Sequence, residues 1–348
     1  MNARRILLWL HRWVGVIGGL VIFVAAVTGA LLVFERPLNR SLAPELYPRG
    51  THDSARVPVE QVLSALHAQH PDARVEGIHL PRDDRDALIL FAGPRAMHAD
   101  PHTGALLGWR PRRGGLTQTL VKLHVNLLAG PTGGTVVVVA TALTIALALT
   151  GLWLWWPLRI GWFRRGASFR RFNLDLHSVA GLYSSAFLLV IAITGVTLRY
   201  LHLEHPRPPA SSPPSAGRAP IAVDAAIARA EAALPGARAA AVEMPGPNPR
   251  APFRVQLAFP EDGSPAGRSV VFVDRFAGTT LAVHSARAGS WLERYANLQL
   301  SLHTGTVGGL PTQIVAFLTC GALILQILSG YILWWKRPSS GTGSGSNG

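Results

Sequence analysis

The sequence predicts a membrane protein with four transmembrane α-helices from an internal duplication and two α+β domains outside the membrane. Hydrophobic residues make up 49% of the 348 residues and charged residues only 15%, a balance typical of membrane spans joined by polar domains. Four apolar runs are long enough to cross the hydrocarbon core, which takes a helix of roughly 20 residues. Histidines and Ser/Thr-Gly pairs recur at fixed offsets, which indicates that one unit occurs twice.

The elements follow one another as two similar halves. The first apolar run resembles a signal peptide, but it is too long and lacks a small-residue cleavage site, so we expect a retained helix. The predicted segments are helix 1 (1–35), outer domain 1 (36–120), a His-bearing segment with helix 2 (121–157), a basic loop (158–173), helix 3 (174–202), a proline-rich linker with outer domain 2 (203–297), a His-bearing segment with helix 4 (298–336) and a flexible tail (337–348).

The distribution of basic residues predicts the orientation in the membrane. Arginine and lysine flank the start of helix 1, fill the 158–173 loop and follow helix 4. By the positive-inside rule, both termini and this loop are cytoplasmic, and lipid is the surrounding medium of the spans. Tryptophan pairs that close helices 2 and 4 are typical of an aromatic belt at the interface. Because the membrane accounts for the net charge of +14, we expect no nucleic-acid partner.

The sequence of each outer domain predicts an amphipathic helix followed by short strands. The helix patterns cover 57–70 and 221–234, and strand-like runs of β-branched and aromatic residues come next. Each domain then reaches a turn with Asp four residues before Gly, at 100–104 and 274–278. This spacing predicts a hairpin turn between two strands.

Four of the thirteen histidines lie on or just before the spans. The others lie in or beside the polar domains, where a solvated surface position is the ordinary role. An anchoring role at the membrane interface would explain any one of the four. Metal ligation explains their number, spacing and pairing together. Two sets of positions match. At an offset of 166, His11 corresponds to His177 and Thr28-Gly29 corresponds to Thr194-Gly195. At an offset of 179, His124 corresponds to His303 and Thr150-Gly151 corresponds to Ser329-Gly330.

The predicted membrane topology places the histidines in two pairs, one on each side of the membrane. His11 and His177 lie at the cytoplasmic ends of helices 1 and 3 and form the inner pair, while His124 and His303 form the outer pair. A structural zinc site normally has four protein ligands, and neither pair is accompanied by a further cysteine or carboxylate set. Two axial imidazoles describe a b-type haem. Without a C-x-x-C-H motif the attachment is non-covalent, so we expect two haem b groups with bis-His ligation.

Glycines leave room beside the inner ligands. Gly15 and Gly181 each lie four residues after a predicted ligand, which places a bare backbone patch one helical turn away. Close helix packing is the alternative explanation, since Gly15 and Gly19 also form a G-x-x-x-G pattern.

Several motifs resemble the PepSY-associated transmembrane proteins: "LHRWVGVIGG", "DPHTGALLG", "KLHVNLLAG", "LDLHSVAGLY", "LQLSLHTG" and "SGYILWWKR". The resemblance covers nearly the whole chain apart from the tail. It implies PepSY-like outer domains in the periplasm, a bacterial inner-membrane location and an oxidoreductase that reduces ferric siderophores such as ferrioxamine. The second turn, "DRFAGTTL", departs from the family pattern, which suggests that the two outer domains differ in role.

Three functions are compatible with this reading. The first is a ferric-siderophore reductase in which electrons pass through both haems to iron bound in the periplasm. The second keeps the haems but delivers the electrons to another periplasmic redox partner. The third is a non-enzymatic PepSY sensor or modulator, which would not need the four histidines. No flavin or nicotinamide site is visible, so the electron donor, a cytoplasmic reductant or a quinol, is not identified by the sequence.

Overall fold

The computed structural model divides the chain into a helical unit and an α+β unit. The helical unit comprises residues 1–33, 120–199 and 303–348, and the α+β unit comprises 34–119 and 200–302. The structure describes residues 2–335 except 50–54, 157–160, 165, 202–211, 213–216, 247, 249 and 263–266. The predicted tail therefore lies outside the described residues, as do most of the predicted proline-rich linker and part of the basic loop.

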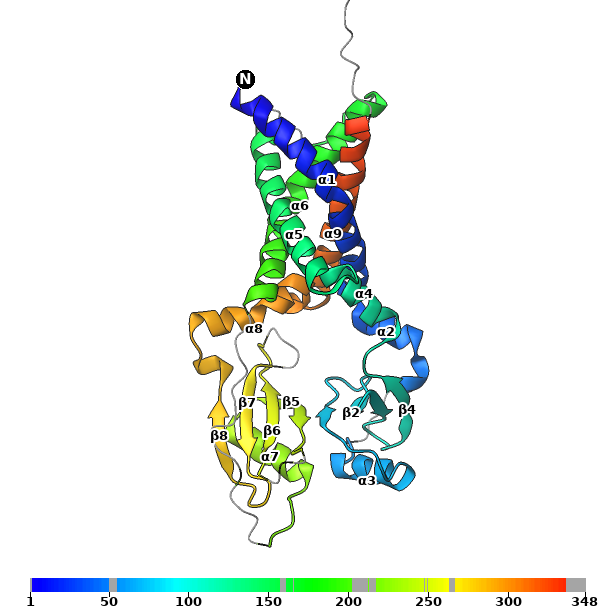
Figure 1. Cartoon of the computed structure of the whole chain (residues 1–348), viewed down its shortest axis with the longest axis vertical. Helices are drawn as coiled ribbons and strands as arrows, with labels where there is room; N and C mark the ends of the chain where they lie inside the picture. Colours follow the sequence, from blue (N-terminus) through cyan, green and yellow to red (C-terminus); the bar gives the residue numbers. More distant parts are fainter. Residues whose placement is uncertain are drawn as a thin grey trace, which may run out of the picture. The chain divides into compact units, whose positions relative to one another are not determined.

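Four long helices form the helical unit (Figure 1), in agreement with the predicted spans. Each is long and apolar enough to cross a membrane, and α1 packs against both α5 and α9. Large apolar side chains such as Ile17, Leu20 and Leu318 are exposed on these helices, as expected for surfaces that contact lipid. Their bounds are α1 (Ala3–Val33), α5 (Gly130–Trp155), α6 (Phe169–Tyr200) and α9 (Leu310–Trp335).

Helix α6 begins five residues earlier than the predicted start at residue 174. The added turn is polar, so hydropathy alone does not mark it. It is stabilised by the fully buried carboxylate of Asp175, whose Oδ1 lies 3.0 Å from Nε of Arg171. The other oxygen of Asp175 accepts a hydrogen bond from the backbone N–H of Arg164. The basic loop is therefore tied to the end of the helix that carries His177.

The two His-bearing segments are short helices that precede α5 and α9. They are α4 (Gly115–Asn126) and α8 (Trp291–Thr304), and both begin earlier than predicted. After α8 the chain turns through Gly305 (φ 75°) and Gly309 (φ 67°), where glycine adopts the left-handed conformation without steric cost. After α4 the chain turns through Leu127 (φ 53°) and Leu128 (φ 60°), which adopt the left-handed conformation. This conformation is uncommon for residues with a side chain.

The strands of both outer repeats join in one antiparallel sheet of eight strands, in the order β4-β3-β2-β1-β5-β6-β7-β8. The two repeats meet where β1 pairs with β5 and Ile78 lies opposite Val242. The sequence predicts two α+β repeats, and the structure adds that they share this sheet. The strands are β1 (Gly77–His79), β2 (Leu88–Ala92), β3 (Arg95–Ala99), β4 (Leu106–Pro111), β5 (Arg238–Glu243), β6 (Phe253–Ala258), β7 (Ser269–Val273) and β8 (Thr280–His284).

Helices α3 (Val59–Gln69) and α7 (Val223–Ala233) pack with the sheet in a single apolar core. Strand residues alternate between this core and the other face, as in β6, where every second residue is buried. The two helices also cap each other. The carboxylate of Asp224 accepts hydrogen bonds of 2.9 Å from the backbone N–H groups of Val59 and Glu60, and Glu60 accepts one from Val223. Shorter helical segments are α2 (Glu35–Leu42) and the 3₁₀ turns Pro44–Leu46, Ala286–Ala288 and Thr306–Gly308.

The two predicted hairpin turns are confirmed. Residues 100–104 join β3 to β4, and residues 274–278 join β7 to β8. In each turn the Asp side chain accepts hydrogen bonds from the backbone N–H groups two and three residues later. The departure from the family pattern in the second turn therefore leaves the turn itself unchanged. The difference lies in the side chains between Asp and Gly, which are Pro101, His102 and Thr103 in the first turn and Arg275, Phe276 and Ala277 in the second.

Candidate cofactor sites in the helical unit

The structure brings the four predicted histidines together in the two predicted pairs. The ring centroids of His11 and His177 are 6.3 Å apart, and those of His124 and His303 are 6.0 Å apart. Each half of the duplication supplies one ring to each pair. Along α1, His11 and Thr28 are 17 residues apart, and Thr28 contacts the outer pair, so the pairs are separated by about 25 Å at the helical rise of 1.5 Å per residue.

Each outer histidine contacts a Ser/Thr-Gly pair on a membrane-spanning helix from the same half of the duplication. We call this Ser/Thr-Gly pair the seat of the histidine. Nδ1 of His124 donates to the backbone oxygen of Ala25 (2.9 Å) and lies 3.1 Å from the Thr28 hydroxyl. Nδ1 of His303 donates to the oxygen of Ile191 (2.8 Å) and lies 3.4 Å from the Thr194 hydroxyl. The seats are Thr28-Gly29 on α1 and Thr194-Gly195 on α6.

The inner histidines are held in the same way. Nδ1 of His177 donates to the backbone oxygen of Gln326 (3.0 Å) and lies 3.2 Å from the Ser329 hydroxyl. Nδ1 of His11 lies 3.0 Å from the Thr150 hydroxyl, which itself donates to the backbone. The inner seats are Thr150-Gly151 on α5 and Ser329-Gly330 on α9. The Ser/Thr-Gly pairs that the sequence shows only as repeats therefore lie against the four histidine rings and orient them.

These hydrogen bonds determine which ring nitrogen is available. A backbone oxygen can only accept, so Nδ1 carries the proton in His124, His177 and His303. The unprotonated Nε2 keeps its lone pair, which is the form that binds a metal. Hydrogen bonding of the second ring nitrogen is the usual support of a metal-bound histidine. Burial, and then the neighbouring His303, lower the pKa of His124 to about 4, so this ring is neutral at pH 7.

The seat glycines allow the imidazoles to approach the helix backbone. A Cβ atom placed on Gly195 would lie 3.0 Å from Cε1 of His303, and one on Gly29 would lie 3.2 Å from Cε1 of His124. At the inner pair the corresponding distances are 3.3 Å at Gly151 and 3.6 Å at Gly330. Of the two predicted bare patches, the one at Gly15 is open, because a Cβ there would meet nothing within 4 Å. The one at Gly181 is covered by the side chain of Gln326, whose Oε1 lies 3.3 Å from the position of a Cβ there.

Both pairs fit a six-coordinate haem iron. Bonds from first-row metals to imidazole nitrogen are about 2 Å long, so two rings on opposite sides of one ion have centroids about 6 Å apart. Both observed separations match that value. Among the described residues no group of three or more His, Cys, Asp or Glu side chains is placed to hold a metal ion. His11 with His177, and His124 with His303, would therefore each hold one haem between the two halves.

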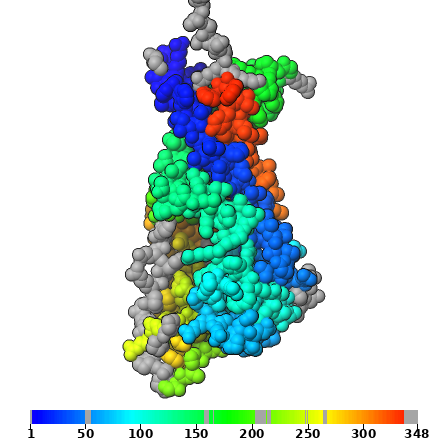
Figure 2. Space-filling model, turned by 45° about the vertical axis from the view of Figure 1, so that its right-hand side comes forward, coloured from blue at the N-terminus to red at the C-terminus, as the bar shows by residue number. Residues whose placement is uncertain are grey.

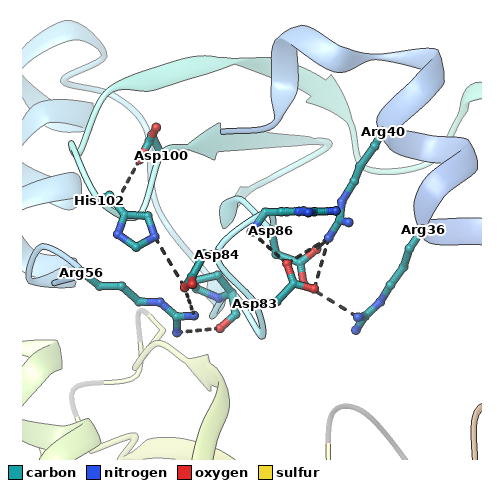
Figure 3. A network of polar contacts seen from close by, with 10 residues as sticks. Arg36, Arg40, Arg56, Asp83, Asp84, Asp86, Asp100 and His102 are labelled. Atoms are coloured by element: carbon teal, nitrogen blue, oxygen red, sulfur yellow. Dashed lines mark hydrogen bonds and ion pairs between the residues drawn. The ribbon is translucent and has the colours of Figure 1, made fainter. Parts of the chain in front are cut away.

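The α+β unit carries a separate polar network around the first Asp-Gly turn (Figure 3). Arg40 on α2 bonds Asp86 (2.7 Å) and Asp83 (3.1 Å) in the loop after β1. His102 of the turn lies 3.7 Å from Asp84 in the same loop. The network ties α2, this loop and the turn together, which is a structural role.

The face of the molecule drawn in Figure 2 includes residues of both repeats. The family model described as the PepSY-associated TM region matches residues 8–337. A search of curated proteins returns no match.

Proposed function

The chain belongs to the family of PepSY-associated transmembrane proteins, and we propose that it is a di-haem b protein that reduces ferric siderophores. The observation that carries the proposal is the arrangement of the two histidine pairs. Each pair has a ring separation suited to one iron, and each ring is hydrogen-bonded through Nδ1 at its seat, which leaves a lone pair on Nε2 of His124, His177 and His303. The substrate class comes from the resemblance to ferrioxamine-type reductases.

Haem b, when bound, supplies a one-electron Fe(III)/Fe(II) couple at each pair. Reduction of a ferric chelate needs one electron, and a donor such as a reduced flavin or a quinol loses two electrons and two protons. One donor molecule therefore reduces two ferric chelates. Ferric siderophores bind iron through hard oxygen donors, which hold Fe(II) less strongly than Fe(III). This chain contributes the two ligand pairs, their orientation and a path through the apolar core.

The direction of transfer follows from the proposed orientation. Basic residues gather at the end of the helical unit that carries the inner pair, including Arg4, Arg12 and Arg171. We therefore assign the termini to the cytoplasm and the α+β unit to the periplasm of a bacterial inner membrane. Electrons would enter near His11 and His177 and leave near His124 and His303.

Reoxidation of the reduced protein tests this function. The purified chain is reduced with dithionite, freed of excess reductant and mixed with a ferrioxamine-type chelate while the haem b absorbance is followed. We expect rapid reoxidation in the wild type and slow reoxidation in His303→Leu. His67→Leu on the exposed side of α3 is the matched control and should behave as the wild type.

The same experiment separates the alternatives. Reoxidation by other periplasmic redox partners but not by ferric chelates would point to an electron conduit with a different acceptor. A chain that carries no haem after haem-replete expression would point to a sensor or modulator.

A further inference from the structure

One position distinguishes the inner pair from the outer pair. The residue three before each seat hydroxyl is Ala25, Leu147, Ile191 or Gln326 in the four seats. Three of these residues give their backbone oxygen to the Nδ1 of a histidine. Only Gln326 carries a polar side chain, and it lies within the apolar span α9. Polar side chains inside a membrane are costly and are commonly functional.

A hydrogen bond fixes the orientation of the Gln326 side chain. Its Nε2 donates to the hydroxyl of Ser184 on α6 over 3.1 Å, and Ser184 is buried. Its Oε1 therefore points the other way and lies 3.3 Å from the position of a Cβ on Gly181. The first half has Leu147 and Gly18 at the matching positions. The Gln326–Ser184 pair is thus specific to the second half of a duplicated scaffold.

The amide oxygen lies beside Gly181, one helical turn from His177, whereas the matching Gly15 has nothing within 4 Å of its Cβ position. We expect a haem held by His177 to lie near this oxygen, because the backbone oxygen of the same glutamine accepts the hydrogen bond of the His177 ring. Ferric haem carries one more positive charge than ferrous haem. In a medium of low dielectric constant, the negative end of a fixed amide dipole stabilises the more positive form.

We propose that Gln326, oriented by Ser184, lowers the reduction potential of the inner haem below that of the outer haem. Gln326 acts as a positioning and tuning residue, since His177 and His11 remain the ligands. A lower potential at the inner pair makes electron transfer toward the outer pair thermodynamically favourable. The inference rests on the proposed di-haem function and adds a direction to it.

A redox titration of the purified chain, followed by haem absorbance, tests the inference. We expect Gln326→Leu, which introduces the residue of the matching position, to raise one of the two midpoint potentials. A tenfold change in the ferric-to-ferrous ratio at fixed potential corresponds to about 59 mV for a one-electron couple. In a His303→Leu background, which keeps only the inner pair, the same shift should appear in the single remaining component.

Two further variants separate tuning from a structural role. Ser184→Ala removes the acceptor that orients the amide and should shift the same component in the same direction. Leu328→Ala, an exposed position on α9, should leave both potentials unchanged. If Gln326 only joined α6 to α9, the Gln326→Leu protein would lose stability without a change in potential.

The outcomes distinguish this inference from the function on which it rests. Two haems per chain with unchanged potentials in Gln326→Leu and Ser184→Ala would overturn the tuning role alone. A wild-type chain without haem would overturn both. If Gln326→Leu loses the inner haem, the Ser184→Ala titration tests the tuning role instead: a raised potential supports it, and an unchanged potential overturns it.

Discussion

Alanine substitutions at the four seat glycines should weaken haem binding in the order of their distances to the histidines. The Cβ of alanine would lie 3.0 Å from the ring at Gly195, 3.2 Å at Gly29, 3.3 Å at Gly151 and 3.6 Å at Gly330. Ordinary carbon–carbon contacts are about 3.5–4.0 Å long. The first alanine therefore requires the imidazole of His303 to move, whereas the last makes a normal contact.

The size of the effect follows from overpacking. Adding a methyl group to a filled site costs about 1–3 kcal/mol, and every 1.4 kcal/mol is about tenfold in affinity. We expect Gly195→Ala to weaken the outer haem by roughly 5-fold to 150-fold. Gly330→Ala should leave both haems near wild-type affinity. Alanine is about 1 kcal/mol more favourable than glycine within a helix, so loss of haem would not reflect loss of the fold.

Transfer of haem to excess apomyoglobin measures this effect. The assay gives a rate for each haem, and the wild-type chain and Gly330→Ala serve as references. Gly195→Ala should release one haem faster and keep the other. Equal rates in Gly195→Ala and Gly330→Ala, or faster release from Gly330→Ala, would refute the assignment of these glycines as histidine seats.

Three further predictions concern the α+β unit and the turn after α4. Burial, and then the charge of Arg110, lower the pKa of His98 to about 4, so the unfolded chain binds an extra proton between pH 6.5 and 4. The free energy of unfolding should therefore fall by up to about 3 kcal/mol across that window, and melting curves of His98→Leu should lose this pH dependence. Asp224→Ala removes the acceptor of two backbone N–H groups and should lower the unfolding free energy by about 1–2 kcal/mol; an unchanged denaturation midpoint would contradict the cap. Leu127→Gly should raise the melting temperature, because glycine relieves a positive φ that costs about 1 kcal/mol or more; an unchanged or lower melting temperature would contradict strain at this turn.

The spans and the histidine pairs could be predicted from the sequence because they depend on patterns that persist along the chain. Apolar runs predict the four spans, basic residues predict their direction, and the offsets of 166 and 179 match His11 to His177 and His124 to His303. Together these constraints leave one possible pairing within each membrane face. The local contacts of the seats could not be predicted, since a Ser/Thr-Gly pair in a span is also typical of helix packing.

The joining of the two repeats could not be predicted. Strand β1 has three residues, and β5 reads "RAAAVE", which has little of the β-branched and aromatic character of strands. Their pairing is a contact between residues far apart in the sequence, so no local pattern marks it. Gln326 was also missed, because a single amide in an apolar run acquires significance only beside Ser184 and Gly181.

The haem content of the purified chain tests the central claim most directly. The protein is expressed with sufficient haem, purified in detergent and measured by the pyridine haemochrome assay against the protein concentration. Two haem b groups per chain, reduced to one in His11→Leu and in His303→Leu, are the predicted result. A wild-type chain without haem would contradict the account, and one haem per chain would show that one of the two pairs is assigned wrongly.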